Sequence, residues 1–224
     1  EVFAVDADDG IVDIANALIE HRVHRLLVTE GDDYVGLVAA MAAGYAVIMA
    51  IPFGREFFEL DEATKQQFIA PGAHGQTGYT GLLVETAASS DKPDWKEMLN
   101  WASPIAPGHP LKRKFPTAYP DQILPEQAVP GITDVLYRFH DAIADLQRRF
   151  LRVIAEGIGC HETFFDDMVA DGPTLTRAIR YPAMSELDTA LGDDGSPGHV
   201  WAAEHGDINL ITALPRATAP GLQV

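Results

Sequence analysis

The chain has 224 residues, of which 47% are hydrophobic, and its formal net charge is -17. A chain of this length and hydrophobicity can bury a sizeable core. The excess of negative charge argues against nucleic acid or an anionic membrane as a partner and is typical of an acidic cytoplasmic protein. The single cysteine excludes an internal disulfide framework and a cysteine-rich zinc site.

The first 42 residues have the pattern of a helix followed by two strands. Apolar residues recur at helical spacing over residues 11–21, and short β-type runs at residues 23–28 and 34–38 flank a turn at residues 30–33. This order resembles one motif of the cystathionine-β-synthase (CBS) regulatory modules. Those modules pair two such motifs to form a nucleotide-binding cleft.

Two interpretations of this region stay open. The CBS-like one implies nucleotide sensing, but Ala39 and Ala42 stand where that family usually has polar residues that hold a ribose. In the other, residues 1–50 are the helix–strand entrance of the domain that follows, which would occupy residues 51–224. We favour the second because no linker separates the two parts.

Residues 35–53 carry no formal charge and approach the minimum length of a membrane-spanning helix. They are rich in Ala and Gly, are interrupted by Pro52, and follow Asp32 and Asp33 rather than basic residues. We therefore predict a buried helix here and no membrane partner.

The middle of the chain alternates between helical and irregular patterns. Residues 55–65 predict the end of one helix and the start of another, and residues 71–131 hold nine of the 15 prolines, which predicts loops and short strands. Apolar residues three and four apart predict a long helix over residues 131–159, with Thr133 as its N-cap and a glycine, Gly157 or Gly159, as its stop.

The last third of the chain has a mixed pattern. A short helix is predicted over residues 162–169. Strands are predicted over residues 175–181, 200–207 and 208–214, with a Gly- and Asp-rich loop at residues 192–198.

The most informative motif is His205-Gly206-Asp207. Residues two apart on a strand share a face, so His205 and Asp207 are expected to project together. With one more His from a distant strand, this pair would form a two-His-one-carboxylate triad that suits Fe(II) and leaves positions open for O2 and substrate. The His-x-Asp spacing alone is common, however, and a hydrogen-bonded surface pair is its more frequent meaning.

A longer ordered series surrounds this motif. It consists of Phe57-Phe58 with Lys65, Gly78-Tyr79, Pro93-Asp94-Trp95-Lys96-Glu97, the long helix before Phe164-Phe165, Arg180-Tyr181-Pro182, His205-Gly206-Asp207, Ile208-Asn209-Leu210-Ile211-Thr212 and Gly221-Leu222-Gln223-Val224. The series resembles the isopenicillin N synthase-like, 2-oxoglutarate-dependent Fe(II) oxygenases over about residues 53–224.

The resemblance implies a fold and a set of site residues. The fold would be mainly β with flanking helices, a double-stranded β-helix (jelly roll) that is incomplete at the C-terminus. His205 and Asp207 would be metal ligands for Fe(II). Tyr181 would hydrogen-bond a carboxylate of the co-substrate or substrate, with a core position as the equal alternative, and Arg180 would pair on the outer side of the same strand.

The implied activity is oxidation of a small-molecule C–H bond with O2 as co-substrate. Fe(II) and 2-oxoglutarate would do the chemistry, and no side chain is predicted as an acid–base or nucleophilic catalyst. In the family a third ligand His and an Arg-x-Ser pair follow the Gly-Leu-Gln-Val strand, so we expect them beyond Val224. A nucleotide-sensing CBS-like regulator and a catalytically inactive oxygenase-like scaffold are the alternatives.

Overall fold

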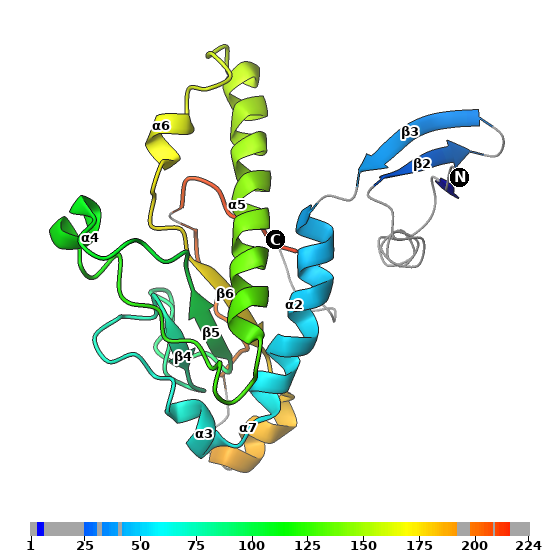
Figure 1. Cartoon of the computed structure of the whole chain (residues 1–224). Helices are drawn as coiled ribbons and strands as arrows, with labels where there is room; N and C mark the ends of the chain where they lie inside the picture. The colour runs from blue at the N-terminus through cyan, green and yellow to red at the C-terminus, as the bar shows by residue number, and fades with distance from the viewer. Residues whose placement is uncertain are drawn as a thin grey trace.

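The computed structural model describes residues 4–6, 25–30, 33–39, 42–191, 198–207 and 209–215. Within these residues the strands form two three-stranded sheets (Figure 1). The strands are β1 (Ala4–Asp6), β2 (Arg25–Glu30) and β3 (Asp33–Ala39) in the first sheet, and β4 (Gly78–Thr80), β5 (Glu97–Trp101) and β6 (Thr176–Arg180) in the second. The helices are α2 (Ala42–Glu59), α3 (Glu62–Gln66), α4 (Pro110–Lys114), α5 (Ile132–Gly157), α6 (Asp166–Val169) and α7 (Met184–Leu191).

The first sheet stands beyond the N-terminal end of α2 (Figure 1). Strand β1 runs parallel to β2, and β2 pairs antiparallel with β3, so both strands predicted from the sequence are confirmed. The helix predicted over residues 11–21 lies outside the described residues. The helix predicted over residues 35–53 is wrong in its first part, because residues 33–39 satisfy their backbone groups in the ladder with β2.

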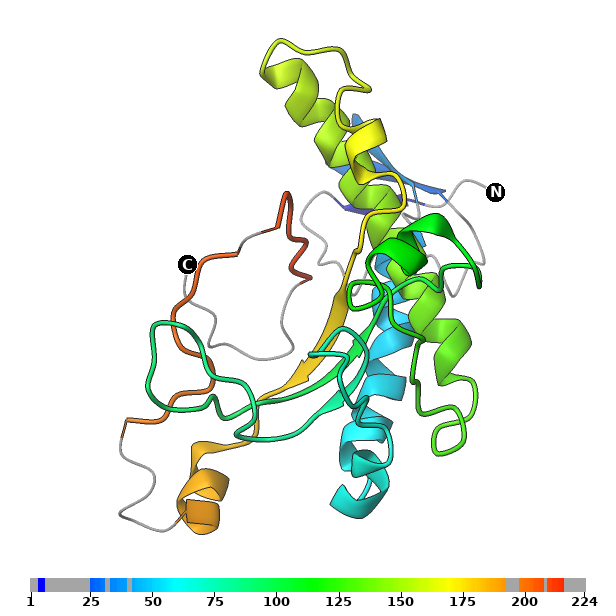
Figure 2. The same cartoon turned by 90° about the vertical axis from the view of Figure 1, so that its left-hand side faces the viewer.

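Helix α2 starts at Ala42 and contains Pro52 in its interior. In the part of the chain that the structure describes, no helix combines the length and the apolar character that a membrane span requires. Helices α2 and α5 instead lie side by side and cover one face of the second sheet (Figures 1 and 2). Residues 198–207 and 209–215 lie on the other side of that sheet (Figure 2).

The main core forms where α2 and α5 meet the second sheet. Its buried aromatic and aliphatic side chains come from both layers and from the loop that precedes α5. The cluster consists of Phe57, Phe58, Tyr79, Leu99, Trp101, Val129, Ile132, Leu136 and Phe139.

Strand β5 is the centre of the second sheet and pairs antiparallel with both neighbours. Leu99 is opposite Tyr79 on one side and Ala178 on the other. All five residues of β5 are buried, so both faces of the strand are covered. Because alternate residues share a face, Glu97 lies on the same face as Leu99 and Trp101, which places a carboxylate in the core.

The helix boundary predicted in residues 55–65 is confirmed, since α2 ends at Glu59 and α3 follows Asp61. Asp61 is the N-cap of α3 and accepts the backbone N–H of Thr64 at 3.0 Å. The loops and short strands predicted for residues 71–131 are also confirmed, with β4, β5 and α4 separated by irregular chain.

The long helix predicted over residues 131–159 is confirmed as α5, but its predicted N-cap is wrong. Gly131 occupies the N-cap position with a φ of 87°, and no side chain within the helix caps it. The carboxylate of Glu126 does so instead, accepting the N–H groups of Gly131 at 2.7 Å and Thr133 at 3.0 Å. After Gly157 the chain leaves the helix, and Gly159 has a φ of 77°.

Helix α6 and strand β6 confirm the short helix and the first strand predicted after α5. The other two predicted strands are wrong for the described residues 200–207 and 209–214, which form none. A strand needs a ladder of backbone hydrogen bonds. In the described part, one such bond, from Trp95 N to Val200 O at 2.9 Å, joins this segment to the chain just before β5.

The fold therefore agrees with the expectation only at a coarse level. A small antiparallel sheet is backed by helices, and helical residues outnumber strand residues among those described. The expected predominance of β-structure is not met in this part of the chain, because two of the predicted strands lack a pairing partner there.

Candidate functional site

His205 and Asp207 lie close together at the surface. Nε2 of His205 is 4.0 Å from Oδ1 of Asp207, and about half of each side chain is exposed. Divalent metals bind such atoms at about 2.1 Å, so two neighbouring ligands lie about 3 Å apart. The pair must close by about 1 Å to share an ion, which two exposed side chains can do by rotation. The proximity predicted from the sequence is thus present, although no strand creates it.

The ring of His205 has a defined tautomer. Its Nδ1 lies 2.8 Å from the carbonyl oxygen of Ala203. Since a carbonyl only accepts, Nδ1 must carry the hydrogen, and the neutral ring keeps its lone pair on Nε2 beside Asp207. Histidines that bind metals usually donate their other ring N–H in this way. The donor set fits a divalent metal ion.

A second His–Asp pair has the same spacing but the opposite tautomer. Nε2 of His109 is 3.9 Å from Oδ2 of Asp171. Nδ1 of His109, however, accepts the backbone N–H of Leu111 at 3.3 Å and caps α4. The hydrogen of neutral His109 is therefore on Nε2, where it blocks a metal ion. The two pairs have nearly the same His–Asp distance and differ in whether Nδ1 of the histidine donates or accepts a hydrogen bond.

Groups of three or more His, Cys, Asp and Glu side chains suited to a metal ion are absent from the described residues. The pair formed by His205 and Asp207 thus offers two ligands there. The other coordination positions would be filled from elsewhere or by water.

The segment that carries His205 is held against the chain that leads into β5. The backbone N–H of Ala203 donates to Oδ1 of Asp94 at 2.9 Å, and Asp94 is 2% exposed. Lys96, also buried, places its Nζ 2.8 Å from Oδ2 of Asp94 and 2.7 Å from Oε2 of Glu85. A charged cluster, in which Asp94 and Lys96 are buried and Glu85 is partly exposed, thus underlies the residues just before His205.

Two indole N–H groups bond to the backbone at the end of the Arg180-Tyr181-Pro182 element and attach it to the chain near His205. Nε1 of Trp201 donates to the carbonyl oxygen of Pro182 at 2.7 Å. Nε1 of Trp95 donates to the carbonyl oxygen of Ala183 at 3.1 Å. The turn after β6 and the segment before His205 are therefore tied together.

Tyr181 is 46% exposed, so the alternative of a core tyrosine is not met. Partial burial of its hydroxyl raises the pKa of Tyr181, the charge of Lys96 opposes that rise, and Asp94 and Glu85 add to it. The hydroxyl is therefore protonated at neutral pH and can donate a hydrogen bond to a carboxylate.

Arg180 forms an ion pair, as expected, but its partner is buried. Nη1 of Arg180 is 2.7 Å from Oε1 of Glu97, while Oε2 of Glu97 accepts from Lys65 at 2.7 Å and from the Tyr79 hydroxyl at 2.6 Å. Burial acts to raise the pKa of Glu97, but the bonds from Lys65, Tyr79 and Arg180 together hold it below its usual value. This network joins β5 to α3, β4 and β6 and is structural.

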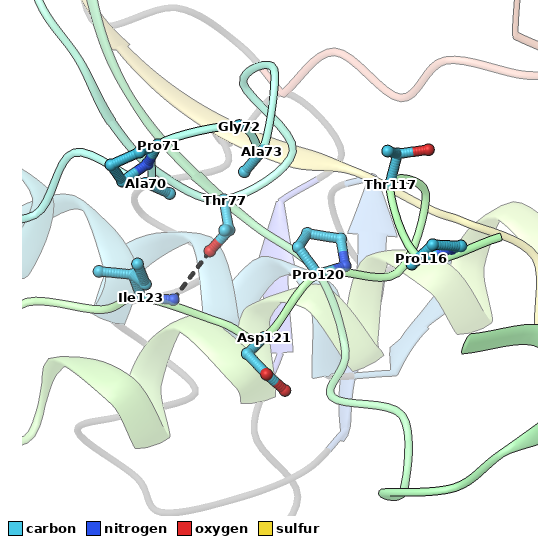
Figure 3. A pocket seen from close by; sticks show the side chains of 10 residues that line it. All are labelled: Ala70, Pro71, Gly72, Ala73, Thr77, Pro116, Thr117, Pro120, Asp121 and Ile123. Carbon is cyan, nitrogen blue, oxygen red and sulfur yellow. Dashed lines mark hydrogen bonds between the residues drawn. The ribbon is translucent and has the colours of Figure 1, made fainter. Parts of the chain in front are cut away.

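A surface pocket of about 280 Å³ lies elsewhere, between the loops at residues 70–77 and 116–123 (Figure 3). The Thr77 hydroxyl in its wall accepts the backbone N–H of Ile123 at 3.0 Å, and Asp121 pairs with Lys112. None of the predicted site residues lines this pocket. Of the polar side chains in its wall, Thr77 thus joins the two loops and Asp121 is paired with α4.

Sequence reasoning missed the role of Asp94, Lys96, Trp95 and Trp201. The first three stand in a run that carries the family resemblance, and Trp201 lies four residues before His205. The pattern did not say which group each would bond. A signal was present, because charged residues next to an apolar strand are rarely buried without a partner.

Comparisons with known proteins relate the chain to dioxygenases. Residues 49–126 match the sequence model of the family described as non-haem dioxygenase in morphine synthesis, N-terminal. The chain is 25% identical over 170 residues to 2'-deoxymugineic-acid 2'-dioxygenase of Hordeum vulgare, covering 75% of this chain and 43% of that protein. It is 29% identical over 181 residues to a 2-oxoglutarate-dependent dioxygenase of Gibberella zeae, covering 74% and 42%. The chain thus spans less than half the length of these relatives.

Solved structures show the same likeness in fold. A full-length protein of Neurospora crassa, solved in complex with alpha-KG, superposes with a TM-score of 0.54 at 22% identity, covering 92% of this chain and 61% of that one. A protein of Caulobacter crescentus assigned to the 2OG-Fe(II) oxygenase family gives a TM-score of 0.54 at 22% identity, covering 81% and 56%. The sequence similarities favour the oxygenase over the CBS-like regulator. The chain is thus similar in sequence to 2-oxoglutarate-dependent dioxygenases over about three quarters of its length, and similar in fold to solved 2OG-Fe(II) oxygenases.

Proposed function

We propose that the whole protein is an Fe(II)- and 2-oxoglutarate-dependent oxygenase that oxidises a C–H bond of a small molecule, with His205 and Asp207 as two of its iron ligands. The observation that carries the proposal is the bond from His205 Nδ1 to Ala203 O, which leaves Nε2 free beside Asp207. Similar structures support the proposal. The Neurospora crassa protein was solved in complex with alpha-KG and, in another structure, with alpha-KG and thymine.

The parts of the site have separate tasks in this proposal. His205 and Asp207 hold the ion, and the ion supplies the activation of O2 when it is bound. The protonated Tyr181 hydroxyl donates to a carboxylate of 2-oxoglutarate or of the substrate and so orients it. The partly exposed position of these three side chains matches a site that must admit a small molecule.

The same proposal covers the architecture of the whole protein. The second sheet would be part of a jelly roll that forms the oxygenase domain from residue 51 onward. Residues 1–50 would be the entrance region, whose first sheet shares no strand with the second among the described residues and which continues through α2 into the oxygenase domain. The acidic charge supports a cytoplasmic location.

Anaerobic titration of the whole protein with Mn(II), a redox-stable substitute for Fe(II), tests the metal assignment. His205→Ala and Asp207→Ala should each weaken binding by about tenfold or more while the circular dichroism spectrum stays unchanged. His109→Ala is the matched control, because His109 has an Asp at nearly the same distance but the wrong tautomer. Unchanged Mn(II) affinity of His205→Ala would refute the proposal.

A further inference from the structure

We propose that Asp94, held in place by Lys96, is the positioning residue that fixes His205 through the backbone of Ala203. This inference rests on the proposed function, since it assigns a task to a residue that would not touch the metal ion. It is carried by an unbroken series of contacts from Glu85 through Lys96, Asp94 and Ala203 to His205.

The burial of Asp94 requires an explanation. Its carboxylate is almost fully removed from water, and a buried charge is retained only where it is paired and hydrogen-bonded. One oxygen, Oδ2, is paired with Lys96. The other, Oδ1, bonds the N–H of Ala203, in a segment 109 residues further along the chain. The carboxylate is thus directed at the His205 segment rather than at a neighbour in β5.

The segment is also attached to the rest of the chain by single hydrogen bonds. Among the described residues it forms no ladder, and the bonds that attach it include those from Trp95 N to Val200 O, from the Trp201 indole to Pro182 O, and from the Ser89 hydroxyl to Glu204 O. Among these attachments, the bond to Asp94 is the one that acts on Ala203, whose carbonyl receives the Nδ1–H of His205. Ala203 is therefore bonded on both of its sides, by Asp94 at its N–H and by His205 at its carbonyl.

Lys96 supports the position of Asp94. Its side chain is 7% exposed and lies between Asp94 and Glu85, so it provides a buried counter-charge to the carboxylate of Asp94 and limits its rotation. A neutral residue at position 96 would leave Asp94 buried without a counter-charge. Loss of Lys96 should therefore act on the His205 segment in the same direction as loss of Asp94.

The experiment compares Asp94→Ala, Asp94→Asn and Lys96→Met with Glu97→Gln in the whole protein. Glu97 is a buried carboxylate in the same run, but it bonds Lys65, Tyr79 and Arg180, and none of these is in the His205 segment. We expect Asp94→Ala to raise the amide exchange rate of Ala203 and to weaken Mn(II) binding about tenfold. The ¹⁵N shifts of the His205 ring should move from the single Nδ1–H tautomer to a mixture.

Asp94→Asn keeps an oxygen for Ala203 but turns a donor or a neutral group toward Lys96, so its effects should lie between those of the parent and of Asp94→Ala. If Asp94→Ala does not fold, Asp94→Asn tests the positioning role of Asp94 in its place. Glu97→Gln should lower stability while Ala203 exchange, the His205 tautomer and Mn(II) affinity stay as in the parent.

Two outcomes separate this inference from the proposed function. If His205→Ala weakens Mn(II) binding but Asp94→Asn and Lys96→Met leave affinity, exchange and tautomer unchanged, the positioning role is refuted and the metal assignment stands. If His205→Ala leaves Mn(II) affinity unchanged, the metal assignment is refuted. In that case the exchange of Ala203 and the ring shifts alone decide whether Asp94 fixes His205.

Discussion

Nζ of Lys65 lies 2.7 Å from Oε2 of Glu97, and the two form a buried ion pair between α3 and β5. The side chain of Glu97 has no exposed surface, and that of Lys65 is 7% exposed. Buried pairs of this kind add little net stability compared with apolar residues, but they are costly to break one side at a time. The pair therefore fixes where α3 sits against the sheet.

Replacing Glu97 by Gln should destabilise the protein strongly. The change leaves Lys65 and Arg180 without the charge that both bond, and removal of one partner of a buried pair costs about 3–5 kcal/mol. Lys65→Met should cost less, because Glu97 keeps Arg180 and the Tyr79 hydroxyl. Urea unfolding measures both. A loss below about 1 kcal/mol for Glu97→Gln would contradict a structural role for the network.

Stability should fall as the pH drops below about 6.5, and His140 is the cause. Burial lowers the pKa of His140 from its ordinary 6.5, although nearby Asp141 opposes the shift. The unfolded chain then binds a proton that the folded chain resists, so the stabilisation is full above pH 6.5 and is lost toward the lower folded pKa.

The slope that His140 contributes is at most about 1.4 kcal/mol per pH unit. Its Nδ1 lies 2.7 Å from the Thr176 hydroxyl, which joins α5 to β6. His140→Gln keeps a polar group there and removes the titration, so the drop between about pH 6.5 and 5 should become shallower. Thermal unfolding at several pH values makes the comparison. An equal loss of stability in both proteins would mean that another group causes the pH dependence.

Gly78→Ala should prevent a normal β4. Gly78 has a φ of 78°, and an added Cβ would lie 2.3 Å from the backbone oxygen of Phe68. Gly75 has a similar φ of 73° but no atom within 4 Å of such a Cβ, so Gly75→Ala measures the backbone strain alone. That strain costs about 1–2 kcal/mol, and Gly78→Ala should cost clearly more. Equal losses in chemical unfolding would mean that the clash relaxes freely.

The elements that the sequence predicted correctly are those set by local patterns. The apolar spacing of α5, the break between α2 and α3 at Asp61, and the strand at residues 176–180 each follow from neighbours along the chain. The strands predicted over residues 200–214 failed in their described parts because a strand depends on a partner far away in the sequence.

The candidate site could be predicted from the sequence to a similar extent as the fold. The two-residue spacing of His205 and Asp207 and the resemblance around Tyr181 pointed to segments that the fold ties together. The spacing could not show which carbonyl would set the tautomer of His205, nor that Asp94 would bond Ala203 across 109 residues. Those bonds depend on the folded backbone, and no local pattern encodes them.

The bond between Trp201 and Pro182 should control how firmly the His205 segment is held. Trp201 is 39% exposed, and its Nε1 donates to Pro182 O at 2.7 Å, beside Tyr181. Trp201→Phe keeps an aromatic ring and removes this donor, at a cost of about 1 kcal/mol. That cost raises the open population of the segment about fivefold, while the unfolding temperature of the whole protein changes little.

Limited proteolysis with mass spectrometry measures this opening, because cleavage follows the open population when reclosing is fast. Cuts in residues 198–207 should appear about five times faster in Trp201→Phe than in the parent. Trp95→Phe is the comparison, since Trp95 is buried and its loss should lower global stability and expose many sites together. If Trp201→Phe is cut no faster than the parent, the indole bond does not hold His205 and Tyr181 in one site.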